Sequence, residues 1–419
     1  MNEHLLQYIW LHRLFNTRFL ESVDRQAILI HHPGIHNKDQ GPDFLHARIQ
    51  IDGLELVGTV EMHIKTSHWY AHAHSGDMHY SNVILHVVWE HDMDFEKSIP
   101  VLCLKGRVPL HILQHYELLM TKTKSIPCAS QIHSVSPLVF SIWKERMFAE
   151  RLMVKVDQIK QHLFQNQQNE EATFWRMIFR SMGMPVNADA FESVFVSIPF
   201  KIWLQCAKRI ELLEALLLGQ ANLLADEFND DYLMMLQREY VYMKKKFNLN
   251  APDLLLSNLR MRPAHFPLIR FVQLATLIHK HPDLYSKMMV ADDIRQMKSW
   301  LMVTPHEFWQ SRYTLKEISV NREKPIGVQM AELMLVNVVL PYRYFQAIQK
   351  GNISEQIKVI ENFTKIKAEH NTYTRSWASL GVKSEHAFDA QALQHLTKNY
   401  CLSKRCLSCA IGKEILKVI

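Results

Sequence analysis

The stretch GPDFLHARIQIDGLELVGTVEMHIK, residues 41–65, predicts a β-hairpin that carries polar side chains on one face. Its centre is Asp52-Gly53, a two-residue signal for a type I′ turn, because both central positions of that turn require a positive φ. Apolar residues alternate on both sides of the turn, at Leu45, Ala47, Ile49 and Ile51 and then at Leu54, Leu56, Val60, Met62 and Ile64. The same period of two places Glu61, His63 and Lys65 together on the opposite face. Such a row of polar side chains is either a solvated face of the sheet or an active site.

The composition is that of an ordinary globular protein. Of 419 residues, 48% are hydrophobic and 21% are charged, and the length allows two or three domains. The first residues do not form a signal peptide, and no apolar run reaches the ~18 residues of a membrane span. The six cysteines do not form a disulfide framework. These features indicate a reduced, cytoplasmic protein with no membrane partner, and a net charge of +6 is compatible with a nucleic-acid partner.

The pattern changes from mixed to helical near residue 136. The first part predicts a helix over 3–20, a strand over 27–31, hairpin strands over 44–51 and 54–65, a loop with a short helix over 66–82, and strands over 83–89 and 99–104. Later apolar spacings predict helices near 138–163, 171–182, 201–225, 230–247, 267–281, 285–301, 327–348, 353–369 and 386–399. We therefore expect an α/β domain over 1–135, with the order αβββαβ and a mixed sheet, and an all-α domain over 136–419 that could form two subdomains.

A histidine-rich loop follows the hairpin, and 13 of the 24 histidines fall in residues 1–91. His72, His74, Asp77 and His79 offer ligands of the kind that Zn²⁺ accepts. The alternative is a polar surface loop, which is the more common role of such a sequence.

Three cysteines, Cys401, Cys406 and Cys409, lie close together near the C-terminus. They could supply three thiolates to zinc or to an iron–sulfur cluster. A fourth ligand would then come from a distant part of the chain, with His395, Cys103, Cys128 and Cys206 as candidates. The interpretation that the sequence favours is simpler: three small hydrophobic side chains that pack a terminal helix.

The order αβββαβ, with Pro42-Asp43 at the head of one strand and Glu61 on the next, resembles the core of the PD-(D/E)XK nuclease superfamily. The resemblance implies that Asp43 and Glu61 bind Mg²⁺, which activates a water and neutralises charge at phosphorus. It also implies a lysine two residues after the second acid. His63 occupies that position and Lys65 follows two residues later, so both are candidates at the attacking water.

The resemblance implies a Mg²⁺-dependent phosphodiesterase that acts on nucleic acid. Two alternatives stay open. One is a non-catalytic module that binds nucleic acid or protein through a degenerate nuclease core. The other is a zinc hydrolase built on the histidine-rich loop.

The hairpin poses a geometric condition for a site at Asp43. A strict two-residue turn pairs Ile51 with Leu54 and therefore Asp43 with Met62, which would turn Asp43 away from Glu61. The site thus requires a β-bulge or an Asp43 that lies ahead of the regular strand, and Gly58 is a candidate position for the bulge.

The chain also resembles, over nearly its whole length, a bacterial family of uncharacterised proteins. The matching stretches are GPDFLHARI, VEMHIKTSHW, YSNVILHVVWEHD, LRMRPAHFPLIRFVQLA and RCLSCAIG. This resemblance implies a single two-part architecture and carries no activity with it.

Overall fold

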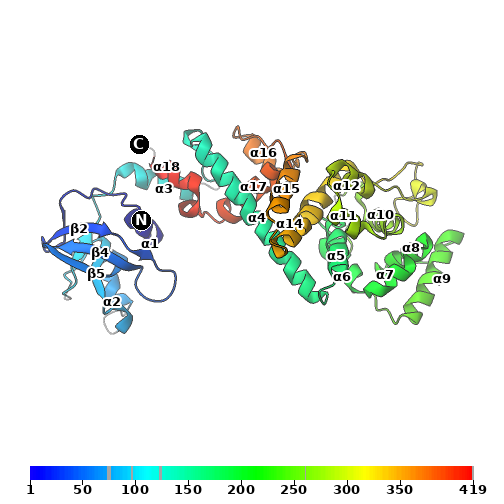
Figure 1. The fold of residues 1–419 in the computed structure, drawn as a ribbon, viewed down its shortest axis with the longest axis horizontal. Coiled ribbons are helices and arrows are strands. Elements are labelled where there is room, and N and C mark those ends of the chain that lie inside the picture. Colours follow the sequence, from blue (N-terminus) through cyan, green and yellow to red (C-terminus); the bar gives the residue numbers. More distant parts are fainter. Residues whose placement is uncertain (73–76, 96–97, 122–124, 260, 418–419) are drawn as a thin grey trace. The chain divides into compact units, whose positions relative to one another are not determined.

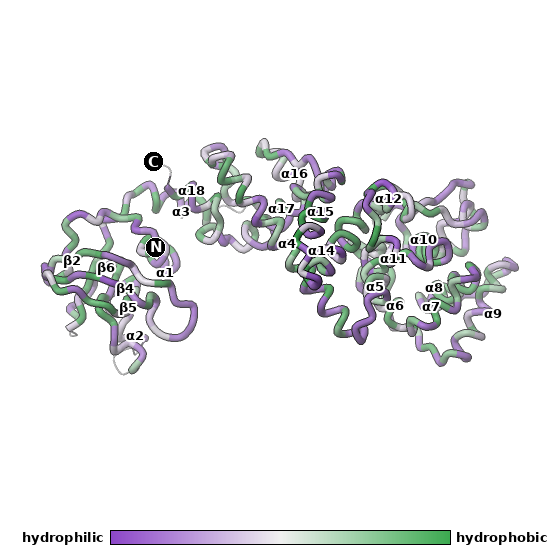
Figure 2. The backbone as a smooth tube through the Cα atoms, in the orientation of Figure 1, coloured by the Kyte–Doolittle hydropathy of each residue, from purple (hydrophilic) through white to green (hydrophobic). Residues whose placement is uncertain are grey.

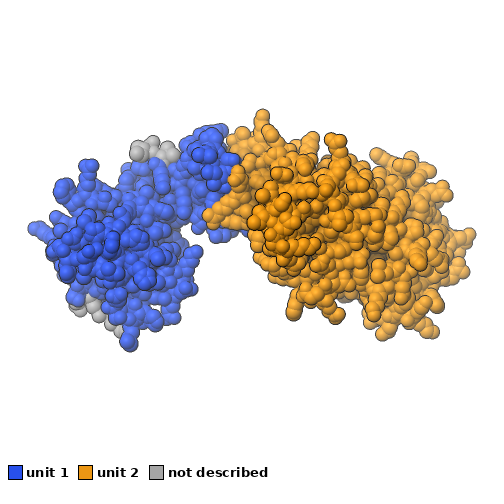
Figure 3. All heavy atoms as spheres, in the orientation of Figure 1, with its two compact units in different colours: residues 1–143, 396–419 blue, residues 144–395 orange. Residues whose placement is uncertain are grey.

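The computed structural model describes residues 1–72, 77–95, 98–121, 125–259 and 261–417, and the chain forms two compact units (Figure 3). The first unit comprises Met1–Trp143 and Leu396–Ile419, and the second comprises Lys144–His395. The expected domains divided the chain once, near residue 135. The structure differs because the C-terminal segment returns to the first unit, where its last helix packs against the helix that ends at Thr121.

The first unit is built on a mixed sheet (Figure 1). Its order is β1-β2-β4-β5-β6-β7, with β3 paired to β4. The antiparallel pairs lie on the β1 side and the parallel pairs β5–β6 and β6–β7 on the other. The strands are β1 (Leu20–Glu21), β2 (Ala27–His32), β3 (Ile35–His36), β4 (Phe44–Ile51), β5 (Leu54–Lys65), β6 (Val83–Glu90) and β7 (Val101–Cys103). A mixed sheet followed by a mostly helical remainder confirms the expected fold at this level.

The hairpin forms at the expected residues. Ile51 pairs with Leu54 across a two-residue loop, and Asp52 and Gly53 have φ of 47° and 86°. Positive φ at both positions is what a type I′ turn requires. The local sequence therefore determines where β4 ends and β5 begins.

A β-bulge then changes the register of the hairpin. Ala47 pairs with Gly58, but Phe44 pairs with Val60, so two residues of β4, Leu45 and His46, face one residue of β5. His46 adopts a φ of 55°, in the left-handed region that accommodates the extra residue. The expected alternation through Leu45 is wrong, because the bulge places Phe44 on the buried face instead.

The bulge does not lie at Gly58, where we considered it. Gly58 has an ordinary strand conformation, and its lack of a side chain serves a close approach instead. A Cβ there would lie 2.4 Å from Ile84 Cγ2 and 2.7 Å from the carbonyl oxygen of Asn82. Gly58 therefore lets the start of β6 approach β5.

The sheet is buried on both faces where the second half of β5 meets β6. One face is apolar and includes Phe44, Ala47, Val60 and Met62, which are at most 1% exposed. The hydrophobic runs of the strands appear green in Figure 2. The other face carries Glu61, which pairs with His86 of β6 across the parallel register. Both residues are buried, and so is His63. Two members of the predicted polar row, Glu61 and His63, therefore lie inside the protein, whereas Lys65 is exposed.

Short helices complete the first unit, and α1 and α2 both pack against β5. The helix expected over 3–20 is shorter, because α1 ends at Leu11 and Arg13 adopts a φ of 50°, which no helix continues through. The elements are α1 (Glu3–Leu11), α2 (His68–Ala71), α3 (Leu110–Thr121) and α18 (Ala410–Lys417), the 3₁₀ turns η2 (Met78–Tyr80), η3 (Ile132–Ser134) and η8 (Cys406–Ser408), and the π-helix η7 (Thr397–Cys401).

The second unit is helical, as expected, and the long α4 (Pro137–Gln165) leads into it. Two expected helices, over 201–225 and 285–301, are each divided in two. In the second case the Asp293 side chain accepts a hydrogen bond from the Arg295 backbone and begins a new helix. No described helix is long and apolar enough to cross a membrane. The α-helices are α5 (Glu170–Met182), α6 (Ala188–Val196), α7 (Phe200–Cys206), α8 (Ile210–Gln220), α9 (Asp231–Lys246), α10 (Pro267–Lys280), α11 (Leu284–Val290), α12 (Ile294–Leu301), α13 (Val328–Met334), α14 (Leu340–Gln349), α15 (Ile353–Thr364), α16 (Thr372–Ala378) and α17 (Ala387–Leu396).

Candidate functional site

The bulge brings Asp43 and Glu61 together. The backbone N–H of Asp43 donates to Glu61 Oε2 at 3.1 Å, and the backbone N–H of Met62 donates to Asp43 Oδ2 at 3.0 Å. Gln7 of α1 donates to Asp43 Oδ1 at 2.7 Å. Asp43 is thus held beside the Glu61 strand by contacts with residues that are distant in the sequence, and it does not simply cap a local turn.

Burial raises the cost of ionising both carboxyls, and the charge of Asp43 raises it further for Glu61. Burial, and then the charge of Asp43, raises the pKa of Glu61 from 4.5 to about 9. Burial also raises the pKa of Asp43 to about 6, although hydrogen bonds from Met62 and Gln7 oppose that rise. The charge of Glu3 acts in the same direction on both groups. Strong shifts of this kind, at neighbouring acids, are typical of functional sites.

His63 extends the site as the middle of three contacting imidazoles. Its Nε2 lies 3.6 Å from Glu61 Oε1 and 3.2 Å from His72 Nδ1, while its Nδ1 lies 3.0 Å from His86 Nε2. His63 is 1% exposed, whereas His72 is exposed at the end of α2. The burial of Glu61 and His63 rules out a solvated face at these two residues.

Lys65 lies at the other, exposed end of β5. It pairs with Glu90 of β6. A hydrogen bond and the charge of Lys105 lower the pKa of Glu90, and the charge of Lys65 adds to them. The charge of Lys65 also helps the Ser67 hydrogen bonds to lower the pKa of Asp92. Lys65 therefore belongs to a surface cluster of charges, and of the two expected candidates for the lysine role, His63 is the one beside the carboxyls.

The histidine-rich loop divides between two groups. His72 contacts His63, while His79 Nδ1 lies 2.7 Å from Asp77 Oδ1 on the surface. His74, the remaining candidate ligand, lies outside the described residues. Within the described ranges, no group of three or more His, Cys, Asp or Glu side chains is placed to hold a metal ion as it stands.

Four residues of the site did not emerge as site residues from the sequence: Glu3, Gln7, Tyr80 and His86. Burial, and then the charges of Glu61 and Asp43, raises the pKa of the Tyr80 phenol to about 12, which places Tyr80 at the same carboxyls. His86 sits in the apolar run of β6, and its Nε2 contacts Nδ1 of His63. For Gln7, the sequence offered only its place among the polar residues of the helix predicted over 3–20, and this does not show that it contacts Asp43.

The C-terminal cysteines are buried in the first unit. Cys401, Cys406 and Cys409 are each 7% exposed and are free thiols. Burial raises the pKa of all three thiols, most strongly that of Cys401. Cys103 and Cys206 lie elsewhere, with Cys103 Sγ donating to the Trp89 carbonyl at 3.3 Å and Cys206 Sγ lying 3.8 Å from Met243 Sδ.

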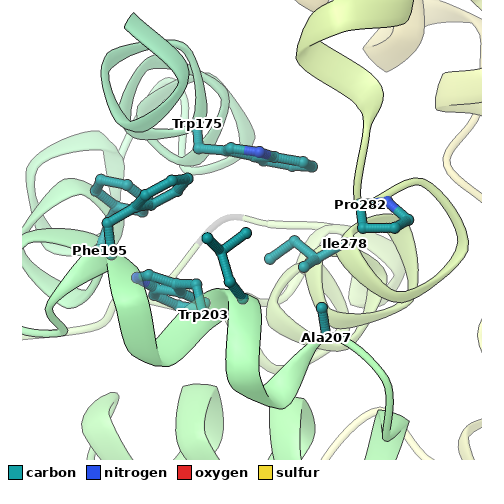
Figure 4. A pocket seen from close by; sticks show the side chains of 8 residues that line it. Trp175, Phe195, Trp203, Ala207, Ile278 and Pro282 are labelled. Carbon is teal, nitrogen blue, oxygen red and sulfur yellow. The ribbon is translucent and has the colours of Figure 1, made fainter. Parts of the chain in front are cut away.

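The second unit holds an apolar pocket between α5, α7 and α10 (Figure 4). Trp175, Phe195 and Trp203 point into it, and none of its lining residues is titratable. The cavity volume is about 10 Å³, which is about the space that one water requires. This pocket is packed core and does not compete with the carboxyl site.

Comparison with known proteins assigns the chain to a family without assigning an activity. No curated protein and no solved structure matches it significantly. A family profile described as "protein of unknown function (DUF2851)" matches residues 3–372. The matched region includes Asp43, Glu61 and His63 and ends before RCLSCAIG, a stretch that we had counted among the family features. The chain therefore belongs to the DUF2851 family of proteins of unknown function.

Proposed function

We propose that the first unit is a Mg²⁺-dependent phosphodiesterase that acts on nucleic acid, with a core like that of the PD-(D/E)XK nucleases. The observation that carries the proposal is the β-bulge at Leu45–His46, which sets Asp43 beside Glu61. Apart from the two-residue strands β1 and β3 and the 3₁₀ turn η2, the element order is α1, β2, β4, β5, α2, β6, with β6 parallel to β5, and this order supports the proposal.

The Asp43 and Glu61 carboxyls suit a bound Mg²⁺ ion, because a cation would relieve the cost of burying two acids side by side. Mg²⁺ prefers oxygen ligands and is commonly held by one or two carboxylates together with waters and substrate phosphates. The negative charge of Asp43 disfavours ionisation of the neighbouring buried Glu61. A cation that replaces the proton on Glu61 would stabilise both carboxylates. Asp43 and Glu61 would hold the ion, which would supply charge stabilisation and an activated water.

The remaining residues would position the acids and move protons. Gln7 and the Met62 backbone orient the Asp43 carboxylate. His63 stands where the superfamily has its lysine, with Nε2 near Glu61. A proton taken up at His63 Nε2 can pass to Nδ1 of the exposed His72, 3.2 Å away, and then to solvent. We assign His63, rather than Lys65, to the attacking water.

Cleavage of labelled single- and double-stranded DNA and RNA with Mg²⁺ or Mn²⁺ tests the proposal. Glu61→Gln keeps the shape of the side chain and removes its charge, so the cleavage rate should fall by at least ~10²-fold. His63→Ala should reduce the rate by about 10²-fold while Mg²⁺ still binds. Lys65→Ala is the matched control on the same strand and should retain nearly full activity.

Two results would contradict the proposal. One is a wild-type protein that cleaves no nucleic acid with either metal, and another is a Glu61→Gln variant as active as wild type. A wild-type protein that binds nucleic acid without cleaving it would favour the binding module with a degenerate nuclease core. If Lys65→Ala were inactive and His63→Ala active, the assignment of His63 would be wrong although the metal site could stand.

A further inference from the structure

The C-terminal cysteines meet a fourth cysteine that is distant in the sequence. Cys128 is buried, and the pKa of Cys401 is raised by burial and then by the proximity of Cys128, Cys409 and Cys406. Cys128 thus lies near enough to act on Cys401, whereas Cys103 and Cys206 contact the Trp89 carbonyl and Met243 Sδ instead. The sequence favoured a packing role for three thiols because a fourth ligand would have to come from a distant part of the chain.

Contacts on both sides of Cys128 hold the two segments together independently of any titration. Lys404 donates to the carbonyl of Met120, and the Ser136 backbone donates to Glu414 Oε1 at 3.0 Å. The rings of Trp143 and Tyr400 pack edge to face at 5.4 Å. The segment with Cys128 is therefore clamped against the segment that carries the other three thiols.

The backbone around the thiols is tightly folded. A Cβ on Gly412 would lie 2.3 Å from the carbonyl oxygen of Cys406, so glycine is required for α18 to pass this close. The backbone N–H groups of Gly412 and Ile411 oppose the rise that burial causes in the pKa of Cys409. Backbone N–H donors of this kind suit a thiolate better than a thiol.

We propose that Cys128, Cys401, Cys406 and Cys409 form a four-thiolate site for a thiophilic metal centre, either Zn²⁺ or an iron–sulfur cluster. Both take four cysteine thiolates. Binding replaces four S–H bonds by four sulfur–metal bonds and releases four protons to solvent. The charges of Lys404 and Lys413, which favour the thiolate forms of Cys406 and Cys409, would offset part of the resulting negative charge.

The site would assemble when the metal binds. No group of three or more ligands among the described residues is already placed around one point, so side-chain rotation would complete it. Its role would be structural, because it joins the C-terminal segment to the segment of the same unit that carries Cys128. The site is independent of the carboxyl site and of the phosphodiesterase proposal.

Metal analysis of the full-length protein tests the proposal. The protein is purified without chelator and without oxygen, and zinc, iron and acid-labile sulfide are measured per chain. We expect about one zinc, or iron with equimolar sulfide and visible absorption. Cys128→Ser and Cys406→Ser should each lose the metal, whereas the control variants Cys103→Ser and Cys206→Ser should keep it.

Thiol labelling of the wild type covers the case in which the cysteine variants do not fold. Native protein should protect these four thiols from alkylation, and a strong chelator should expose all four together. Two results would overturn the proposal: wild-type protein without stoichiometric zinc or iron, or a Cys128→Ser variant that retains all of the metal.

Discussion

Replacing Glu61 by glutamine tests the electrostatics of the Asp43–Glu61 site without any assumption about its substrate. Burial and the Asp43 charge raise the pKa of Glu61 to about 9 in the folded protein, against 4.5 as its ordinary value. Folding therefore takes up a proton at any pH between these two values. A raised folded-state pKa contributes stability in full below about pH 4.5, and that contribution is lost as the pH rises toward 9.

The size of the effect follows from about 1.4 kcal/mol for each pKa unit. Between pH 6 and pH 8 the metal-free wild type should lose about 3 kcal/mol of unfolding free energy through this carboxyl. Because Glu61 and Asp43 titrate together, this loss is a property of the pair of carboxyls. The amide introduced by Glu61→Gln would remain neutral throughout, so the variant should be similar to wild type near pH 5 and clearly more stable at pH 8. Added Mg²⁺ should stabilise wild type and not the variant.

Urea unfolding in the presence of a chelator, from pH 5 to 8.5, measures this difference. Hydrogen exchange in peptides from β4 and β5 assigns the transition to the first unit. Glu55→Gln is the matched control, because Glu55 is exposed on the same strand and forms only a surface ion pair with Arg48 at 3.4 Å; its effect should stay within about 0.5 kcal/mol. A stability difference between wild type and Glu61→Gln that does not change with pH would refute the reasoning.

Three further predictions concern the same strands. Because the raised pKa keeps Glu61 protonated at neutral pH, Mg²⁺ binding at pH 7 should release about one proton per ion. The binding enthalpy measured by calorimetry should therefore depend on the ionisation enthalpy of the buffer. A binding enthalpy that is the same in all buffers would show that the carboxyl was already ionised. His46→Val should lower the unfolding free energy by about 1–2 kcal/mol and weaken Mg²⁺ binding, because a β-branched residue resists the positive φ at this position. His46→Gly should leave the unfolding free energy nearly unchanged. Equal melting temperatures for the two variants would contradict a strained bulge. Gly58→Ala should cost about 1–3 kcal/mol through its clash with Ile84 and Asn82, and a variant as stable as wild type in urea would show that β6 can move away.

The sequence by itself determined the local elements. Alternation and the Asp52-Gly53 signal located both hairpin strands to the residue, and the continuous apolar run from Val83 located β6. Helical spacing after residue 137 identified the helical remainder. These features depend on neighbours within a few positions, where backbone geometry and side-chain period leave few options.

Tertiary structure decided the site. The bulge at His46 contains no glycine, so the sequence offered no signal for the positive φ at that position. The bulge forms because Phe44 and Ala47 both lie on the buried face. The approach of Gln7 to Asp43 and the pairing of His63 with His86 join segments that are distant in the sequence, and so does the gathering of Cys128 with the three C-terminal cysteines. Periodicity reports which face a residue occupies, but the partner across that face is selected by the packing of the whole unit.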